Sequence, residues 1–121
     1  MKVALHHVAL DVDDLAAALG FYVDSLGFTE LRRPDFGFPG AWLGMGDHQL
    51  HLVEVGGPLP ANGGRHFALQ VEDRDDAVRA LRAKGLTVDP VPETPGAGRQ
   101  AFLVDPAGNL IELNEPTGPV P

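Results

Sequence analysis

The feature that most constrains this chain is an internal repeat. The string HVALDVDD at residues 7–14 returns as HFALQVED at residues 66–73, a separation of 59 positions (66 minus 7). Alanine, leucine, valine and the closing aspartate match without a gap. Repeats of about this length usually mark duplicated supersecondary units that pack on one another. The sequence therefore predicts one domain built from two similar halves.

Both copies alternate apolar and polar residues, which is typical of a strand with one buried face. The apolar face carries Val8, Leu10 and Val12 in the first copy and Phe67, Leu69 and Val71 in the second. The other face carries His7, Ala9 and Asp11, matched by His66, Ala68 and Gln70. A face with a polar head and a small spacer makes a poor core, and we interpret it as the lining of a ligand cavity.

Composition excludes several classes of partner. The chain has 121 residues, 44% of them hydrophobic, and a net charge of −8 with nine lysines and arginines. This charge argues against nucleic acid and anionic membranes, which are bound through basic patches. With no long apolar run, no leader-like segment and no cysteine, the sequence favours a cytoplasmic protein without disulfides or thiolate metal sites.

Each half is predicted to run strand, helix and then about three strands. Asp13 and Asp14 precede apolar residues spaced three and four apart, which indicates a capped helix ended by Gly27. The apolar face of this helix is Leu15, Ala18, Leu19, Tyr22 and Leu26. The other elements expected in this half are strand 2–12, strand 28–33, an aromatic loop at 34–40, and a hairpin of 41–46 and 49–54 around residues 46–48.

The second half repeats this plan after a linker rich in glycine and proline. We assign one domain, 1–121, with module one at 1–55, the linker at 56–64, module two at 65–115 and an extended, poorly ordered tail at 116–121. The elements expected in module two are strand 65–72, helix 73–84 ended by Gly85, short strand 86–91, loop 92–98, and a hairpin of 100–104 and 109–114 around turn 105–108. The fold class is α+β, with a helix on the apolar face of each sheet and the polar faces lining a shared concavity.

Four candidate metal ligands occupy matched places in the two halves. Aligning the last strands of the two halves makes His51 the repeat partner of Glu112. The apolar residues on either side, Leu50 and Leu52 or Ile111 and Leu113, point to the opposite face of the strand. Each half thus offers one ligand from its first strand and one from its last, namely His7, His51, His66 and Glu112. Imidazole and carboxylate suit one divalent ion such as zinc, iron(II), nickel, manganese or cobalt. His6, of opposite parity, and His48, in a turn, are assigned to the surface.

Several motifs together resemble the vicinal oxygen chelate superfamily, also called glyoxalase/bleomycin resistance/dioxygenase. They are HHVAL at 6–10, GFYVDSLGF at 20–28, the His66 strand and DPAGNLIEL at 105–113, so the resemblance covers almost the whole chain. It implies paired βαβββ modules that form a cupped, partly open eight-stranded barrel with the helices outside, and commonly a homodimer. It also implies a divalent metal held by His7, His66 and Glu112, which fall on the usual ligand positions of the family.

His51 is where the chain departs from some branches of the family. Glyoxalase I and epimerases generally have a carboxylate or amide at that position, whereas ring-cleaving extradiol dioxygenases place an acid/base histidine on the equivalent strand but are usually longer. Fosfomycin-type thiol transferases share the His, His, Glu set, although a phosphonate substrate favours a more basic pocket. His51 is therefore a metal ligand or a catalytic acid/base.

Three functions stay open at this point. The first is a metal-dependent lyase or isomerase of glyoxalase type that coordinates two adjacent oxygens of a small substrate, with Glu112 and His51 as catalytic residues. The second is an iron(II) extradiol-type dioxygenase with His51 as acid/base. The third is a non-catalytic small-molecule binding or resistance protein. The candidate substrate contacts are Trp42, Phe36, Phe38 and Arg99.

Overall fold

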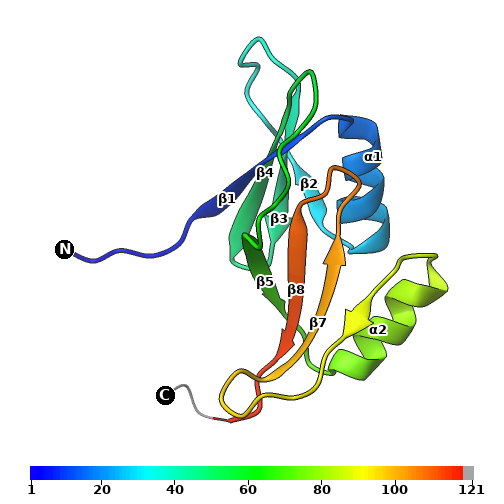
Figure 1. The fold of residues 1–121 in the computed structure, drawn as a ribbon. Coiled ribbons are helices and arrows are strands. Elements are labelled where there is room, and N and C mark those ends of the chain that lie inside the picture. The colour runs from blue at the N-terminus through cyan, green and yellow to red at the C-terminus, as the bar shows by residue number, and fades with distance from the viewer. Residues whose placement is uncertain (119–121) are drawn as a thin grey trace. The chain divides into compact units, whose positions relative to one another are not determined.

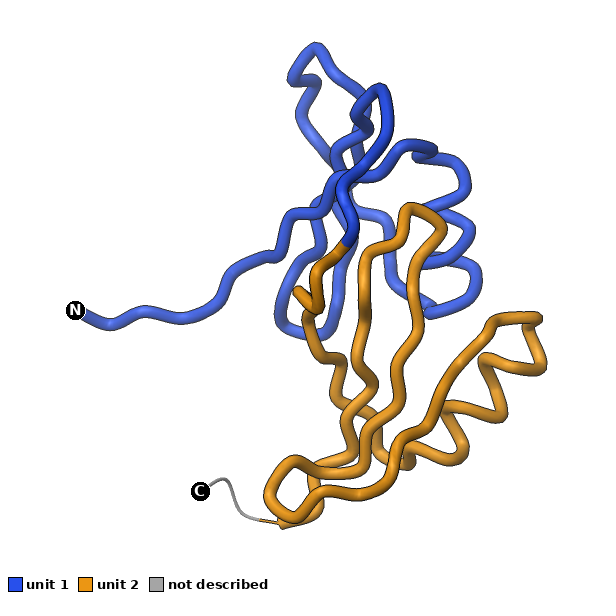
Figure 2. Tube along the Cα trace, in the orientation of Figure 1, with its two compact units in different colours: residues 1–61 blue, residues 62–121 orange. Residues whose placement is uncertain are grey.

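The computed structural model describes residues 1–118 and divides the chain into two compact units, Met1–Ala61 and a second that begins at Asn62. Figure 2 shows the two units in different colours. Neither helix within the described residues is long and apolar enough to cross a bilayer. The three last residues of the predicted tail, 119–121, lie outside the described residues.

The first unit is a four-stranded sheet with a helix, as predicted (Figure 1). The sheet order is β1-β4-β3-β2, in which β1 runs parallel to β4 and the other pairs are antiparallel. Its elements are β1 (His7–Val12), α1 (Leu15–Leu19), a π-helical segment (Gly20–Ser25), β2 (Thr29–Leu31), β3 (Gly40–Met45) and β4 (His48–Glu54).

The second unit repeats this topology with the sheet order β5-β8-β7-β6. Its elements are β5 (His66–Gln70), α2 (Arg74–Ala83), β6 (Asp89–Pro90), β7 (Arg99–Val104) and β8 (Leu110–Glu115). The predicted α+β class and the duplication are thus both confirmed.

Strand alternation separates a buried face from a polar face in each unit. On β4, Leu50 and Leu52 are fully buried, and on β8 Ile111 and Leu113 are buried in the same way. These strands contact α1 and α2, where Ala18 and Val78 are among the buried side chains. Burial of apolar area on this side of each sheet leaves the opposite side for His51 and Glu112.

Both helices start with the same two contacts. An aspartate caps each helix, because Asp14 Oδ1 accepts the Ala17 N–H at 3.0 Å and Asp73 Oδ1 accepts the Asp76 N–H at 2.9 Å. A glutamate at the end of the last strand accepts the first helical N–H, from Leu15 to Glu54 and from Arg74 to Glu115, each at 2.7 Å. An aspartate cap was predicted for the first helix, whereas Asp73 was predicted as the first residue of the second helix rather than as its cap. The glutamate contacts join residues 39 and 41 apart and were not predicted.

Several predicted boundaries are wrong, and each error has a local cause. Residues 2–6 precede β1 because its partner β4 begins at His48. The carbonyl of His6 still accepts the Gln49 N–H at 3.2 Å, but residues 2–5 have no strand to pair with. The single helix predicted for 15–26 changes to π-helical geometry at Gly20, and this change lets Phe21 as well as Tyr22 be buried. His48 belongs to β4 rather than to the turn. β5 ends at Gln70 and β6 has only two residues, while β7 begins one residue earlier than predicted, at Arg99.

Candidate metal and ligand site

The strand register places His51 and Glu112 at equivalent positions of the two units. Ala9 of β1 lies opposite His51 of β4, and Ala68 of β5 lies opposite Glu112 of β8. Because Ala9 and Ala68 are themselves repeat partners, the register confirms the predicted equivalence of His51 and Glu112. The small alanine in each pair leaves room beside the polar side chain.

In the second unit, His66 and Glu112 form a close pair. His66 Nε2 lies 3.1 Å from Glu112 Oε1, and His66 Nδ1 lies 2.9 Å from the carbonyl oxygen of Gly64. A carbonyl oxygen only accepts, so Nδ1 carries a proton and donates it to Gly64. Nε2 of a neutral ring would then face the carboxylate as a second acceptor. The contact requires a cation between the two atoms, either a second proton on His66 or a metal ion.

The pair also has the spacing of two ligands on one ion. Zinc–nitrogen and zinc–oxygen bonds of about 2.0–2.2 Å place neighbouring ligand atoms about 3–3.5 Å apart. Backbone donation from Nδ1 is the usual way in which a metal-ligating histidine is held with Nε2 toward the metal. The residues of the second unit therefore fit a divalent ion, with His66 Nε2 and Glu112 Oε1 as ligands.

The Glu112 carboxylate is buried, and its second oxygen is fully engaged. Glu112 is 6% exposed, and Oε2 accepts N–H groups from Gln100 at 3.0 Å and Asn114 at 2.8 Å. Burial by itself would raise the pKa of Glu112, but hydrogen bonds from Asn114, Gln100 and His66 outweigh it and lower the pKa below its ordinary value. Glu112 is therefore an anion whose free oxygen, Oε1, points to His66.

In the first unit, His51 lies between two other rings. The His7 ring stacks on His51 with centroids 4.0 Å apart and planes at 16°, and Trp42 stacks on the other side at 4.4 Å and 7°. His51 Nε2 donates to Gln49 Oε1 at 2.8 Å. Burial first, and then His7, His6 and Arg33, lower the pKa of His51. His51 is therefore neutral at pH 7, with its Nδ1 lone pair available to a metal or a proton.

Two of the four predicted ligands thus lie together in each unit, His7 with His51 and His66 with Glu112. Within either unit of the described chain, no group of three or more histidine, aspartate and glutamate side chains could hold a metal ion. His6 is exposed and contacts only the neighbouring His7 ring among the rings of residues 1–118. A four-ligand site remains a prediction.

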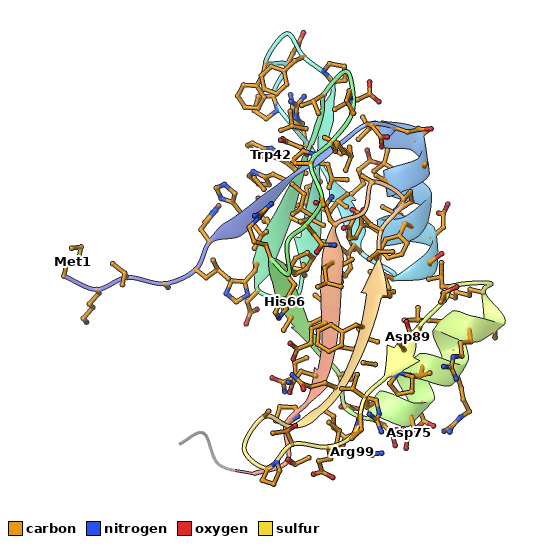
Figure 3. The ribbon with its side chains drawn as sticks, viewed as in Figure 1. Met1, Trp42, His66, Asp75, Asp89 and Arg99 are labelled. Atoms are coloured by element: carbon orange, nitrogen blue, oxygen red, sulfur yellow. The ribbon has the colours of Figure 1, made fainter. Side chains whose placement is uncertain are left out.

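The predicted substrate contacts divide into a cluster and one separate residue. Phe36 packs on Phe38 and Trp42, with centroid distances of 5.8 and 5.9 Å. The rings of His7, His51, Trp42, Phe36 and Phe38 thus form a continuous series, called here the ring stack. Arg99, in the other unit, has the parity of buried Ala101 and pairs with Asp75 of α2 at 2.8 Å (Figure 3). Its role as a substrate contact stays a prediction.

Comparison with known proteins settles the family. The sequence model of the Glyoxalase/Bleomycin resistance protein/Dioxygenase superfamily matches residues 4–113. This chain belongs to that superfamily. The match covers both units and all four candidate ligands.

Relatives in this superfamily carry different activities in their names. A lactoylglutathione lyase of Arabidopsis thaliana is 32% identical over 95% of this chain, which spans 44% of the plant protein. A "Probable lactoylglutathione lyase" of Synechocystis sp. is 36% identical over 90% of this chain and 92% of that protein. The chain thus spans less than half the length of the plant relative.

The solved structure of TnmS3, an antibiotic binding protein from Streptomyces sp. CB03234, is also similar to this member of the superfamily. It is 31% identical with a TM-score of 0.82, and the match covers 96% of this chain and 98% of TnmS3. The superfamily chain described here therefore resembles both enzymes and a binding protein.

Sequence reasoning missed four polar residues of this superfamily chain that hold the candidate groups. Gln100 and Asn114 bind Glu112, Gln49 binds His51, and Arg33 lies over the rings of Phe36 and Phe38. Strand parity could have found three of them. Gln49 and Asn114 lie two residues from His51 and Glu112 and share their faces, and Gln100 has the parity opposite to buried Ala101 and Leu103. Arg33 depends on contacts between separate loop residues.

The His66 pair predicts a titration in the metal-free protein. The hydrogen bond to Gly64 first, and then Glu112, raise the pKa of His66 above its ordinary 6.5. A raised pKa means that the pair stabilises the fold fully below pH 6.5 and loses this contribution as the pH rises through the folded-state pKa. NMR titration of the imidazole should show this raised pKa, and Glu112→Gln should lower it. An unchanged His66 pKa in that variant would contradict the contact.

The two amides on Glu112 predict an effect on metal affinity. Gln100→Leu and Asn114→Leu each remove one donor from Oε2 and should weaken binding of Co²⁺ about 10-fold to 100-fold, measured by absorption titration. Thr87→Leu is the control, because Thr87 is an exposed polar residue between α2 and β6, away from the polar face of the sheet. Equal affinities for all three variants would show that the amides do not position the carboxylate.

Proposed function

We propose that this chain is a divalent-metal-dependent lyase or isomerase of glyoxalase type that acts on a small oxygenated substrate. The contact between His66 Nε2 and Glu112 Oε1 supports the proposal, because its length of 3.1 Å is the separation of two ligand atoms on one divalent ion. Relatives named as lactoylglutathione lyases support the reaction class.

His66 and Glu112 would hold the ion together with His7, and His51 would be a fourth ligand or an acid/base. A bound divalent ion would supply Lewis acidity to two adjacent oxygens of the substrate. The donors are borderline nitrogen and hard oxygen atoms, which suits zinc, iron(II), nickel, manganese or cobalt.

The residues of the chain would handle the proton. Gln100 and Asn114 occupy Glu112 Oε2, so Oε1 is the oxygen left either for the ion or for a proton from carbon. His51 donates Nε2–H to Gln49 and keeps Nδ1 as a second acceptor, and its lowered pKa keeps it neutral near pH 7. The two groups would allow removal of a proton at one atom and its return at another.

We also propose the cupped, partly open barrel and the cytoplasmic homodimer that the sequence predicts. Each unit has only two of the four predicted metal ligands, so a four-ligand site needs one first unit and one second unit. Light scattering tests the dimer. Mixing His7→Ala with Glu112→Ala subunits tests the pairing, because a site shared between two chains would regain activity in one of the two sites of the mixed dimer.

The experiment that tests the function is metal analysis of protein purified without added metal, followed by turnover assays. Zinc or nickel with turnover of a hemithioacetal would support the lyase. Iron with oxygen consumption on a catechol would instead support the iron(II) dioxygenase. A protein that takes up no divalent ion would overturn both.

The second candidate is a small-molecule binding or resistance protein without turnover. The ring stack favours it, because Phe36 and Phe38 are 50% and 46% exposed, and the antibiotic binding relative is 31% identical. Tight ligand binding that is indifferent to a chelator, with no turnover, would support this candidate over the enzyme.

A further inference from the structure

The ring stack of the first unit is packed tightly at one end and loosely at the other. His7, His51 and Trp42 are nearly parallel at 4.0 and 4.4 Å, whereas Trp42 and Phe36 are 5.9 Å apart and tilted by 44°. Packed aromatic rings normally have centroids about 4.5–7 Å apart. The outer rings therefore contact one another in the usual offset or tilted way, whereas the inner three are closely face to face.

That outer end is also exposed. Phe36 and Phe38 are two of the six large hydrophobic residues exposed in the described chain, and both lie on the loop between β2 and β3. Trp42, on the adjacent β3, projects from the sheet on the side opposite to α1 (Figure 3). Exposed aromatic rings grouped around a half-buried tryptophan are typical of a ligand-binding surface.

A cation accompanies these rings. The Arg33 guanidinium lies 4.9 Å from the centre of the Phe36 ring and 5.0 Å from that of Phe38, and its Nη1 donates to the Phe38 carbonyl at 3.1 Å. Within residues 1–118, Arg33 forms no ion pair with a carboxylate. An arginine without a carboxylate partner in a chain of net charge −8 is suited to an anionic ligand.

The loop is held in this shape by its own contacts. Asp35 Oδ1 accepts the Gly37 N–H at 2.9 Å, and Gly37 has φ of 81°, a conformation that other residues rarely adopt. A Cβ on Gly40 would lie 2.9 Å from Arg33 Nη2, so glycine there lets the guanidinium approach β3. The rings and the cation are therefore positioned before a ligand arrives, which lowers the entropic cost of binding.

We infer that the ring stack, together with Arg33, binds a flat aromatic molecule that carries an anionic oxygen group at its edge. The aromatic plane stacks against Trp42 and the two phenylalanines, and the anionic oxygens accept N–H groups from Arg33. This inference deepens the proposed function. It rests on that proposal, which assigns the polar face of β3 and β4 to substrate binding. It narrows the substrate class to planar conjugated acids.

Three probes of similar size separate the two parts of this recognition. We expect 2-naphthoate to bind and to shift the indole N–H signal of Trp42, the only tryptophan of the chain. Decalin-2-carboxylate keeps the charge without the flat ring, and naphthalene-2-carboxamide keeps the ring without the charge. Each should bind at least about 10-fold more weakly than 2-naphthoate in calorimetric titrations.

Variants of the stack locate the binding. Phe36→Leu and Phe38→Leu keep apolar volume but lose the aromatic face, so each should raise the Kd of 2-naphthoate about threefold to tenfold. Arg33→Gln should raise the Kd of 2-naphthoate about tenfold and leave that of the carboxamide unchanged. Val104→Ala, an exposed apolar truncation in the other unit, is the control and should change neither.

Absence of 2-naphthoate binding at millimolar concentration would overturn the inference. Equal affinity for the decalin acid would do the same, and so would an unchanged Kd of 2-naphthoate in the Phe36, Phe38 and Arg33 variants. The titrations are repeated in the Glu112→Gln variant. Binding of 2-naphthoate there, without metal, would support the ring stack even if the metal-dependent function failed. If the wild-type protein does not bind 2-naphthoate, the metal analysis and turnover assays still test the metal-dependent function.

Discussion

Replacing Glu112 by glutamine is expected to reduce the divalent-metal content of the purified protein to background. The change removes the only carboxylate among the four proposed ligands and leaves a neutral amide against His66 Nε2. Loss of an anionic ligand should weaken Co²⁺ affinity by more than about 100-fold, since even removal of an outer-shell contact costs about 10-fold to 100-fold. Absorption titration and metal analysis measure this loss, and His66→Ala should behave in the same way.

Glu93→Gln is the matched control for Glu112→Gln, because Glu93 is an exposed glutamate in the same unit. It should bind metal as the wild type does. Far-UV circular dichroism and the thermal midpoint of the metal-free proteins show whether each variant is folded. Full metal content in folded Glu112→Gln and His66→Ala proteins would mean that the site has been assigned to the wrong residues.

The fold could be predicted from the sequence because strand alternation and the repeat agree with each other. Leu50 and Leu52 on either side of His51 require burial, and Ile111 and Leu113 require it on either side of Glu112. A shift of one residue in either strand would expose all these side chains, so their pattern fixes the faces. The same argument placed each pair of candidate ligands on the polar face of its sheet.

What the sequence could not predict depends on contacts between distant residues. Strand periodicity continues through residues 2–6, but a strand also needs a partner, and β4 offers none before His48. Arg99 was predicted as a substrate contact, but it begins β7 one residue before the predicted strand and pairs with Asp75 of the distant helix α2. Parity assigns Gln100 to the face of Glu112, where the structure has its amide hydrogen-bonded.

The second large effect is expected on stability, from a charged residue inside the second unit. Arg74, at the start of α2, is 9% exposed, and its Nη1 donates to the carbonyls of Val91 at 3.0 Å and Gln100 at 2.8 Å. It joins the helix to the edge of the sheet where β6 and β7 meet. Its pair with Asp75 matters less to stability, because Asp75 is 46% exposed.

Arg74→Met keeps most of the apolar stem but removes both donations, so the Val91 carbonyl loses the Arg74 N–H and the Gln100 carbonyl keeps only the Val91 N–H. The free energy of unfolding should fall by about 2–4 kcal/mol, measured by urea denaturation of the metal-free protein. Arg79→Met on the same helix is the control, since Arg79 and its partner Asp76 are exposed, and it should change stability by less than about 0.5 kcal/mol. Equal losses in the two variants would contradict a specific role for Arg74.

Arg74 also connects this stability to the candidate site. The carbonyl that accepts its Nη1–H belongs to Gln100, the residue whose side chain donates to Glu112 Oε2. The same carbonyl also accepts the Val91 N–H at 3.1 Å, so loss of the guanidinium weakens the support of the backbone that carries the amide but does not free it. Arg74→Met should therefore weaken Co²⁺ binding by no more than Gln100→Leu does, at temperatures where the variant is still folded. Little further loss is expected when the two changes are combined, because they act on one contact. Additive losses in the double variant would show that Arg74 acts on the fold alone.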